Sequence, residues 1–273
     1  MSSTLYVVAT PIGNLQDITH RAQSVLDAVD VVAAEDTRRT RVLLDAINAQ
    51  PDRLISLHAH NEDNATRQVL GMLESGLDVA LVSDAGTPMI NDPGFQLVQA
   101  CRDAQVTVVP VPGCSSIVAA LSVCPLPCQQ FSYLGFLPVK NAARESSLQT
   151  ALAQGVALVI LEAPHRILAT LDMLAVLSSR PVFVARELTK KHETLYCGSA
   201  TEVRDQLGAE PKGEIVLIVG GDSSSSVSLE ERQVMTALLS ELPPAQAARL
   251  ASKFLPSKRG ELYNMAMDLG RSG

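Results

Sequence analysis

The first part of the chain alternates short apolar runs with longer stretches in which apolar residues recur every three to four positions. The short runs are typical of strands buried on both faces of a parallel sheet, and the longer stretches are typical of amphipathic helices. Strands are expected at 5–10, 31–35, 54–58, 79–83 and 106–111. Helices are expected at 18–28, 37–49, 63–75, 93–104 and 114–123. This alternation predicts an α/β domain over residues 1–123, built on a mostly parallel sheet.

A second pattern, richer in strands, follows the proline-containing segment 124–128. Strands are expected at 131–136, 157–162, 182–187, 193–197 and 214–219, and helices at 144–153, 165–178 and 200–207. Some of these strands follow one another too closely for a crossover helix, so the second sheet should contain antiparallel pairs. These elements predict a second α/β domain over residues 124–222.

The pattern after residue 226 predicts helices only. The serine run 223–226 is expected to be a flexible joint, and helices are expected at 229–241, 244–253 and 258–270. Proline-containing breaks separate these helices. A small helix-turn-helix-like tail over residues 227–273 is therefore predicted.

Composition narrows the class of protein. The chain has 273 residues, of which 47% are apolar, but no uninterrupted run approaches the roughly 18 apolar residues of a membrane span. No signal-peptide pattern is found, and the five cysteines form no C-x-x-C pair, so a cytoplasmic protein with reduced thiols is expected. The net charge of −7 means that any contact with nucleic acid must come from a local basic patch.

Two similar turns at the ends of apolar strands indicate a binding site. The run Ser83–Pro88 follows the apolar residues Val79–Val82, and the run Ala9–Asn14 follows the apolar residues Leu5–Val8. Small residues at the carboxyl ends of parallel strands let a ligand approach the backbone. Neither a Gly-x-Gly-x-x-Gly run after the first strand nor a Gly-x-x-x-x-Gly-Lys-Ser/Thr run is present. A small-molecule cleft is predicted, without the usual dinucleotide or triphosphate.

Two aspartates stand where helices are expected to begin. Asp92 precedes Pro93, so the pair predicts a cap and a first helical position for helix 93–104. Asp36 precedes helix 37–49, where a helix cap and a catalytic carboxylate are both open interpretations and can coexist.

His58 and His60 lie two residues apart at the end of an expected strand. In an extended strand their imidazoles would share a face, as in some metal sites. The remaining histidines carry no matching ligand pattern, so no metal is expected.

Six stretches of the chain together resemble the tetrapyrrole methylase superfamily. They are 7–15, 34–38, 82–88, 91–94, 112–113 and 162–166. Within that superfamily the chain is most similar to members that methylate the RNA of the small ribosomal subunit, with further support from 186–190, 212–219 and the tail. The resemblance covers essentially the whole chain in order. Cys114 and Ala163 depart from the residue types common at their positions.

The resemblance implies a two-domain fold, a homodimer, and S-adenosylmethionine (SAM) held between the domains. It also implies 2′-O-methylation of a cytidine in 16S rRNA near the decoding centre. The residues that it places around the cofactor are Pro11, Gly13, Asp84, Ala85, Gly86, Thr87, Ser115, Ser116, Leu161, Glu162 and Ala163.

A ribose hydroxyl is a weak acid, so a neighbouring group should accept or orient its proton. The candidates are Glu35, Asp36, Glu162, Glu187 and Lys190, and Asp36, Arg38 and Lys190 are selected as the catalytic set. RNA phosphates could meet basic clusters, which are Arg38, Arg39 and Arg41; Lys190 and Lys191; and Lys253, Lys258 and Arg259. With no Trp, four Tyr and five Phe, an extensive stacking platform is not expected.

Two other classes of function stay open from the sequence. One is a methylase of porphyrin or corrinoid rings on the same fold, and the other is a non-enzymatic module that binds RNA or nucleotides.

Overall fold

The computed structural model describes residues 3–222 and 229–269. By packing, the chain divides into two units. The first unit contains Met1–Cys124 together with Val184–Tyr196 and Lys212–Val216. The second unit contains Pro125–Phe183, Cys197–Pro211 and Leu217–Gly273. The serine run expected to join the second domain to the tail, 223–226, lies outside the described residues.

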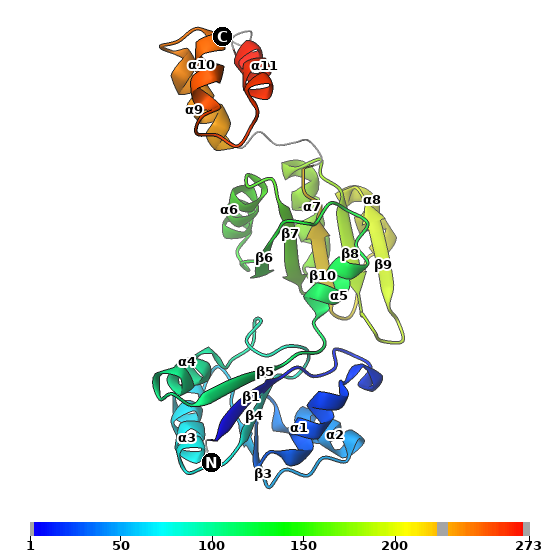
Figure 1. Cartoon of the computed structure of the whole chain (residues 1–273). Coiled ribbons are helices and arrows are strands. Elements are labelled where there is room, and N and C mark those ends of the chain that lie inside the picture. The colour runs from blue at the N-terminus through cyan, green and yellow to red at the C-terminus, as the bar shows by residue number, and fades with distance from the viewer. Residues whose placement is uncertain (1–2, 223–228, 270–273) are drawn as a thin grey trace. The chain divides into compact units, whose positions relative to one another are not determined.

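A parallel five-stranded sheet forms the centre of the first unit (Figure 1). Its strands are β1 (Thr4–Val8), β2 (Val31–Ala34), β3 (Arg53–Ser56), β4 (Val79–Val82) and β5 (Thr107–Val111). Their order is β3-β2-β4-β1-β5, and each neighbouring pair is parallel. The parallel sheet predicted from the apolar runs is confirmed. All five strands therefore present their carboxyl ends at one edge.

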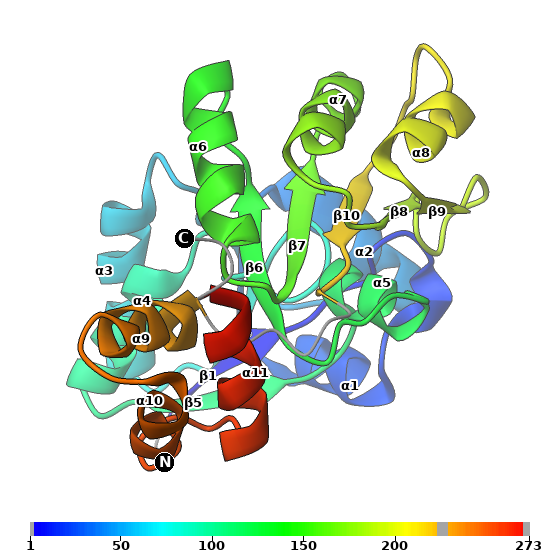
Figure 2. The same cartoon turned by 90° about the horizontal axis from the view of Figure 1, so that it is seen from above.

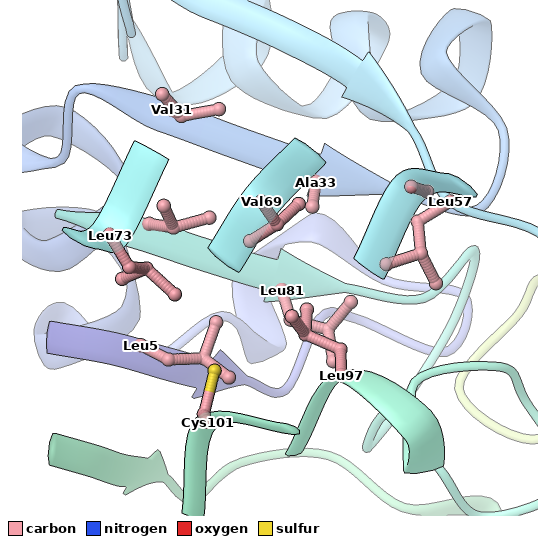
Figure 3. Close-up of a cluster of buried hydrophobic side chains, with 11 residues drawn as sticks. Leu5, Val31, Ala33, Leu57, Val69, Leu73, Leu81, Leu97 and Cys101 are labelled. Atoms are coloured by element: carbon pink, nitrogen blue, oxygen red, sulfur yellow. The ribbon is translucent and has the colours of Figure 1, made fainter. Parts of the chain in front are cut away.

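Helices cover both faces of this sheet, as Figure 1 shows. The helices of the unit are α1 (His20–Ala28), α2 (Thr37–Ile47), α3 (Glu62–Glu74), α4 (Phe95–Asp103) and α5 (Ser116–Ser122), with a 3-10 turn at Leu15–Asp17. Leu81 of β4 packs with residues of α3 and α4 in the cluster drawn in Figure 3, whereas Ala80 packs with α1 and α2. Alternate residues of each buried strand thus face opposite cores.

The strand order places a topological switch point between two neighbouring strands. The chain leaves β1 toward α1 on one face, and it leaves β4 toward α4 on the other face. Because β1 and β4 are adjacent, their loops diverge at the carboxyl edge, which is where open α/β sheets bind ligands.

A second five-stranded sheet has the order β6-β7-β10-β8-β9. Its strands are β6 (Phe131–Phe136), β7 (Ala157–Glu162), β8 (Val182–Arg186), β9 (Thr194–Gly198) and β10 (Ile215–Val219). The strands β6 and β7 are parallel, whereas the neighbours β8 and β9 are joined by a segment too short for a parallel crossover. The predicted mixed sheet is confirmed. The accompanying helices are α6 (Asn141–Leu152), α7 (Ile167–Leu177) and α8 (Ala200–Leu207).

The tail forms a small helical core of its own. Its helices α9 (Leu229–Leu239), α10 (Pro244–Ala251) and α11 (Arg259–Leu269) lie together, as Figure 2 shows. Met235, Ala248 and Leu262 are fully buried among them. The three helices predicted from the sequence are therefore present, each slightly shorter than expected.

Two local predictions are wrong. Helix α4 begins at Phe95 after Gly94, rather than at Pro93 after an Asp92 cap. The amino end of α4 is instead bound by Glu62 of α3, whose Oε1 accepts the N–H groups of Gly94 (2.9 Å) and Gln96 (3.2 Å). Strand β3 ends at Ser56, so His58 does not continue the strand.

Candidate active site

Two reciprocal backbone hydrogen bonds join the diverging loops after β1 and β4. The Thr10 N–H donates to the Gly86 carbonyl (2.9 Å), and the Gly86 N–H donates to the Thr10 carbonyl (3.0 Å). Thr10 is buried, and its hydroxyl also lies 3.3 Å from the Ser83 carbonyl. The two runs singled out in the sequence are thus held directly against each other.

The loop after β5 joins the same group. The Ala9 N–H donates to the Val111 carbonyl (3.2 Å), and the Thr87 hydroxyl donates to the Cys114 carbonyl (2.9 Å). The Ser115 side chain accepts from the Val118 N–H and caps α5. We call 9–14, 83–88 and 112–115 the carboxyl-edge loops. They bring together the predicted residues Pro11, Gly13, Asp84, Ala85, Gly86, Thr87 and Ser115, and Ser116 follows as the first residue of α5.

The sequence predicts that Gly13 and Gly86 allow a ligand to approach the backbone closely. In the structure, other segments of the chain approach both glycines closely. Gly86 has φ +82°, and a Cβ there would lie 3.3 Å from Ile12 Cγ2. A Cβ on Gly13 would collide with Lys190 Cγ and lie 2.9 Å from Thr189 Oγ1. The glycines therefore allow the loops of the first unit to approach one another closely.

Several polar groups at this edge have no protein partner. Within residues 3–222 and 229–269, the backbone N–H groups of Ala85 and Thr87 donate to no protein acceptor. Beside Gly13, the buried Thr189 hydroxyl likewise has no hydrogen-bond partner among the described residues. A polar ligand at the carboxyl-edge loops could bind these groups.

Asp36 caps α2 and also binds the side chain of Arg38. Its Oδ1 accepts the Arg38 N–H (2.9 Å) and Nε (3.1 Å), and its Oδ2 lies 2.7 Å from the second guanidinium nitrogen. The Arg38 guanidinium holds the pKa of Asp36 well below its usual range. The same pair raises the pKa of Arg38. The predicted cap is confirmed, and a carboxylate held in this way is a weak proton acceptor.

Asp84 links the ends of β2 and β4. Its carboxylate accepts the Asp36 N–H (2.9 Å) and lies 3.2 Å from the Arg39 guanidinium, while its own N–H points to Glu35 Oε2 (3.3 Å). These contacts fix the first turn of α2 against the loop 83–88.

Asp92 is a member of the site that the sequence interpretation assigned only to helix capping. Its carboxyl is half-buried, and burial, followed by the charge of Glu35, raises its pKa to about 6, against a hydrogen bond with Ser83. The stretch 91–94 already belonged to the family resemblance, and this was the signal that could have placed Asp92 in the site.

Lys190 is held by two carboxylates. Its ammonium lies 2.9 Å from Glu187 Oε1 and 3.1 Å from Glu214 Oε2. Burial opposes its charge, but the hydrogen bonds to Glu187 and Glu214 outweigh burial and raise the pKa of Lys190. Lys190 is therefore a stable cation and a hydrogen-bond donor rather than a base.

The remaining predicted residues belong to the second unit: Leu161 and Glu162 end strand β7, and Ala163 follows it. Glu162 is 2% exposed, and its Oε2 accepts the Thr170 hydroxyl (2.7 Å). Its Oε1 accepts the Ala163 N–H (2.9 Å) and lies 3.1 Å from Arg166 Nε. Both oxygens are thus engaged within the unit, so the carboxylate fixes the loop that follows β7.

The two neighbouring histidines lie in a turn. The His60 N–H points to His58 Nδ1 (3.2 Å), and Asn61 Oδ1 accepts the His58 N–H (2.8 Å). The prediction of a shared strand face is therefore wrong. Among the described residues, no group of three or more His, Cys, Asp or Glu side chains is placed to hold a metal ion. Helices long and apolar enough to cross a membrane are likewise absent from that part of the chain.

The fold and the carboxyl-edge loops place the chain in a known class. Residues 4–204 match the family described as Tetrapyrrole (Corrin/Porphyrin) Methylases. Solved structures share the fold: a uroporphyrin-III C-methyl transferase from Thermus thermophilus, complexed with S-adenyl homocysteine, has a TM-score of 0.57. It is 20% identical and covers 80% of this chain and 97% of its own. A diphthine synthase has a TM-score of 0.61 at 13% identity, over 80% and 90% of the two chains.

More similar relatives narrow the class. Ribosomal RNA small subunit methyltransferase I of Escherichia coli O157:H7 is 45% identical, over 97% of this chain and 94% of the relative. The protein of the same name from Xylella fastidiosa (strain Temecula1 / ATCC 700964) is 45% identical, over 95% and 97%. Residues 226–270 match the family described as the RsmI C-terminal HTH domain. The chain belongs to the ribosomal RNA small subunit methyltransferase I family.

The raised pKa of Asp92 predicts how stability depends on pH. Because the folded state binds this proton more tightly than the unfolded state, Asp92 lowers the free energy of unfolding as pH rises from about 4 to about 6. Asp92→Asn should therefore be more stable than wild type at pH 7.5, by about 1 kcal/mol because solvent screens a half-exposed carboxyl. The difference should vanish near pH 4.

Urea unfolding at several pH values measures this difference. Asp52→Asn, in an exposed turn before β3, is the matched control and should behave like wild type at every pH. A gain for Asp92→Asn that is the same at pH 4 and pH 7.5 would contradict the predicted titration.

Proposed function

We propose that this protein transfers the methyl group of SAM to the 2′-hydroxyl of a cytidine ribose in 16S rRNA, near the decoding centre of the small ribosomal subunit. The observation that carries the proposal is a family match extending over almost the whole chain, including the helical tail. The cytidine and its 2′-hydroxyl are the target implied by the motif resemblance. A substrate within the ribosome implies a cytoplasmic enzyme.

The carboxyl-edge loops fit SAM as the methyl donor. SAM carries a sulfonium, an ammonium and a carboxylate, so its net charge is positive. The acidic side chains of Glu35, Asp84 and Asp92 gather at this edge and complement that charge. The free N–H groups of Ala85 and Thr87 can bind its carboxylate or ribose oxygens. We assign Pro11, Gly13, Asp84–Thr87, Ser115 and Ser116 to this site.

The reaction needs positioning more than acid or base strength. The ribose oxygen forms a bond to the methyl carbon while the carbon–sulfur bond breaks, and the electron pair of that bond stays on sulfur. The methylated oxygen is then strongly acidic and releases the hydroxyl proton to bulk solvent. SAM supplies an activated methyl group when bound, so the residues of the chain need only align the hydroxyl and exclude water.

Arg38 and Lys190 are suited to hold the RNA in that alignment. The Arg38 side chain is 89% exposed although its guanidinium is fixed by Asp36, and Lys190 is a stable cation. We assign both to the phosphates that flank the target ribose. Asp36 then acts as a positioning residue for Arg38, since its low pKa makes it a weak proton acceptor.

The function is tested by mass spectrometry of 16S rRNA after small subunits are incubated with the protein and SAM. One added methyl group on a cytidine ribose is expected. A wild-type protein that binds SAM but leaves 16S rRNA unmodified would overturn the RNA assignment, and a protein that binds no SAM would overturn the enzyme itself.

Gly86→Ala tests the SAM site within the same assay. The substitution places a side chain at φ +82°, against Ile12, and should displace the Thr10–Gly86 pair, so SAM affinity should fall at least tenfold. Gly76→Ala is the matched control. Gly76 has φ +95° and nothing within 4 Å of the added Cβ, and it precedes β4 at the opposite edge of the sheet. Calorimetry should show unchanged SAM affinity for Gly76→Ala, and equal losses in both variants would count against the site.

Asp36→Asn tests the positioning role. Asparagine caps a helix as well as aspartate but cannot form the ion pair with Arg38. The variant should keep its SAM affinity and melting temperature while kcat falls about tenfold, the value of one charge-assisted hydrogen bond. Asp45→Asn, at an exposed position of the same helix, should leave kcat unchanged. Wild-type turnover by Asp36→Asn would leave Asp36 as a helix cap alone.

We also propose a homodimer, which the exposed edge strand β6 supports. Phe131 and Phe136 on this strand are 46% and 54% exposed, and Val139 follows at 77%. An apolar edge strand is a surface that proteins usually cover. Light scattering should give twice the mass of one chain. Phe136→Asp should shift the mass to that of a monomer. Val176→Asp, at an exposed position of α7, should not change the mass. A monomeric wild-type protein would refute the dimer.

A further inference from the structure

One aromatic side chain of the tail is far more exposed than its apolar neighbours. Phe254 lies between α10 and α11 and is 80% exposed, whereas the next residue, Leu255, packs against the tail core. A Phe ring at this exposure offers a partner a large, planar apolar surface. We call residues 252–259 the tail loop, which ends with the first residue of α11.

Cationic residues flank this ring in the sequence of the tail loop. Lys253, Lys258 and Arg259 are all exposed. Within the described parts of the chain, none of the three forms an ion pair. In a protein with a net charge of −7, a loop that carries three exposed cations, with no ion pair among the described residues, attracts anions.

The acidic groups nearest this surface bind the backbone and fix the shape of the loop. Glu231 of α9 is 2% exposed, and its carboxylate accepts the Ser257 N–H (3.1 Å) and hydroxyl (2.7 Å). Glu261 Oε2 accepts the Lys258 N–H (2.9 Å). The Phe254 N–H donates to the Ala251 carbonyl (3.0 Å). A loop fixed in this way loses little conformational entropy when it binds a partner.

We propose that the tail loop binds an unpaired nucleotide of RNA, with Phe254 stacked on the base and Lys253, Lys258 and Arg259 on the flanking phosphates. A planar ring between cations matches a base between phosphates, and this is how proteins bind single-stranded nucleic acid. A single ring fits one base better than a lipid surface, which would require a broader apolar face. The proposal rests on the proposed function because it assumes an RNA substrate.

The test measures fluorescence anisotropy of a labelled ten-nucleotide single-stranded RNA and of a matched RNA duplex, each titrated with the full-length protein. Wild type should bind the single strand more tightly than the duplex. Phe254→Ala should weaken binding to the single strand about tenfold, and Phe254→Tyr, which keeps a ring, should restore it. Val176→Ala removes an 86% exposed side chain of the second unit and should change nothing.

Contacts between the cations and RNA phosphates should make the affinity for RNA depend on the salt concentration. Lys253→Gln combined with Lys258→Gln should reduce the slope of log affinity against log salt by about 1.4, the value for two phosphate contacts on a single strand. Phe254→Ala should leave this slope unchanged. Because all these side chains are exposed, the melting temperature of each variant should match wild type.

Three results would overturn the proposal: wild-type protein that binds neither RNA, unchanged affinity in Phe254→Ala, or an equal loss in Val176→Ala. Vesicles of phosphatidylglycerol and phosphatidylcholine test binding to a membrane instead. The proposal would also be overturned if binding to these vesicles depended on Phe254 and binding to RNA did not. Methylation of small subunits by wild type is scored separately. Methylation together with unchanged affinity in Phe254→Ala refutes the tail loop alone, whereas absent methylation refutes the proposed function.

Discussion

The reciprocal hydrogen bonds between Thr10 and Gly86 are the contact on which the candidate site depends. The loops after β1 and β4 lead to opposite faces of the sheet, and these bonds hold the loops against each other where they begin. With them, the loops form one surface that also includes the loop after β5. The pair consists of backbone atoms only, so side-chain chemistry cannot replace it. Its sole side-chain requirement is conformational, since Gly86 must adopt a positive φ.

The cationic side chains near this surface are both held by carboxylates. Arg38 and Lys190 are each bound to carboxylates of the same unit, which keep them charged and limit their motion. Fixed cations suit a reaction in which alignment matters more than proton transfer, because their geometry exists before the substrate arrives. These ion pairs also explain why Asp36 and Lys190 are poor bases, although the sequence alone suggested that one of them could accept a proton.

Most elements could be predicted from the sequence because they depend on local periodicity. The buried runs Val31–Ala34 and Val79–Val82, and the Asp36 cap of α2, follow from rules that act within a few residues. The two wrong predictions have different causes: one depends on a residue distant in the sequence, and the other depends on a side chain only three residues away. Glu62 replaced Asp92 as the partner of the α4 amino end, and Asn61 turned the chain after β3. The sequence predicted that Gly13 and Gly86 follow β1 and β4 at the carboxyl edge of the sheet. It could not predict which segments approach them, because that depends on tertiary packing.

The double use of Asp36 limits how this position can vary during evolution. Its carboxylate caps α2 and at the same time orients Arg38. Asparagine would preserve the cap and lose the charge, whereas glutamate would keep the charge on a side chain that is not among the favoured helix caps. Serine and threonine offer a cap with neither charge nor a second oxygen. Aspartate is thus the residue type that meets both demands, and relatives that changed it would have to change Arg38 as well.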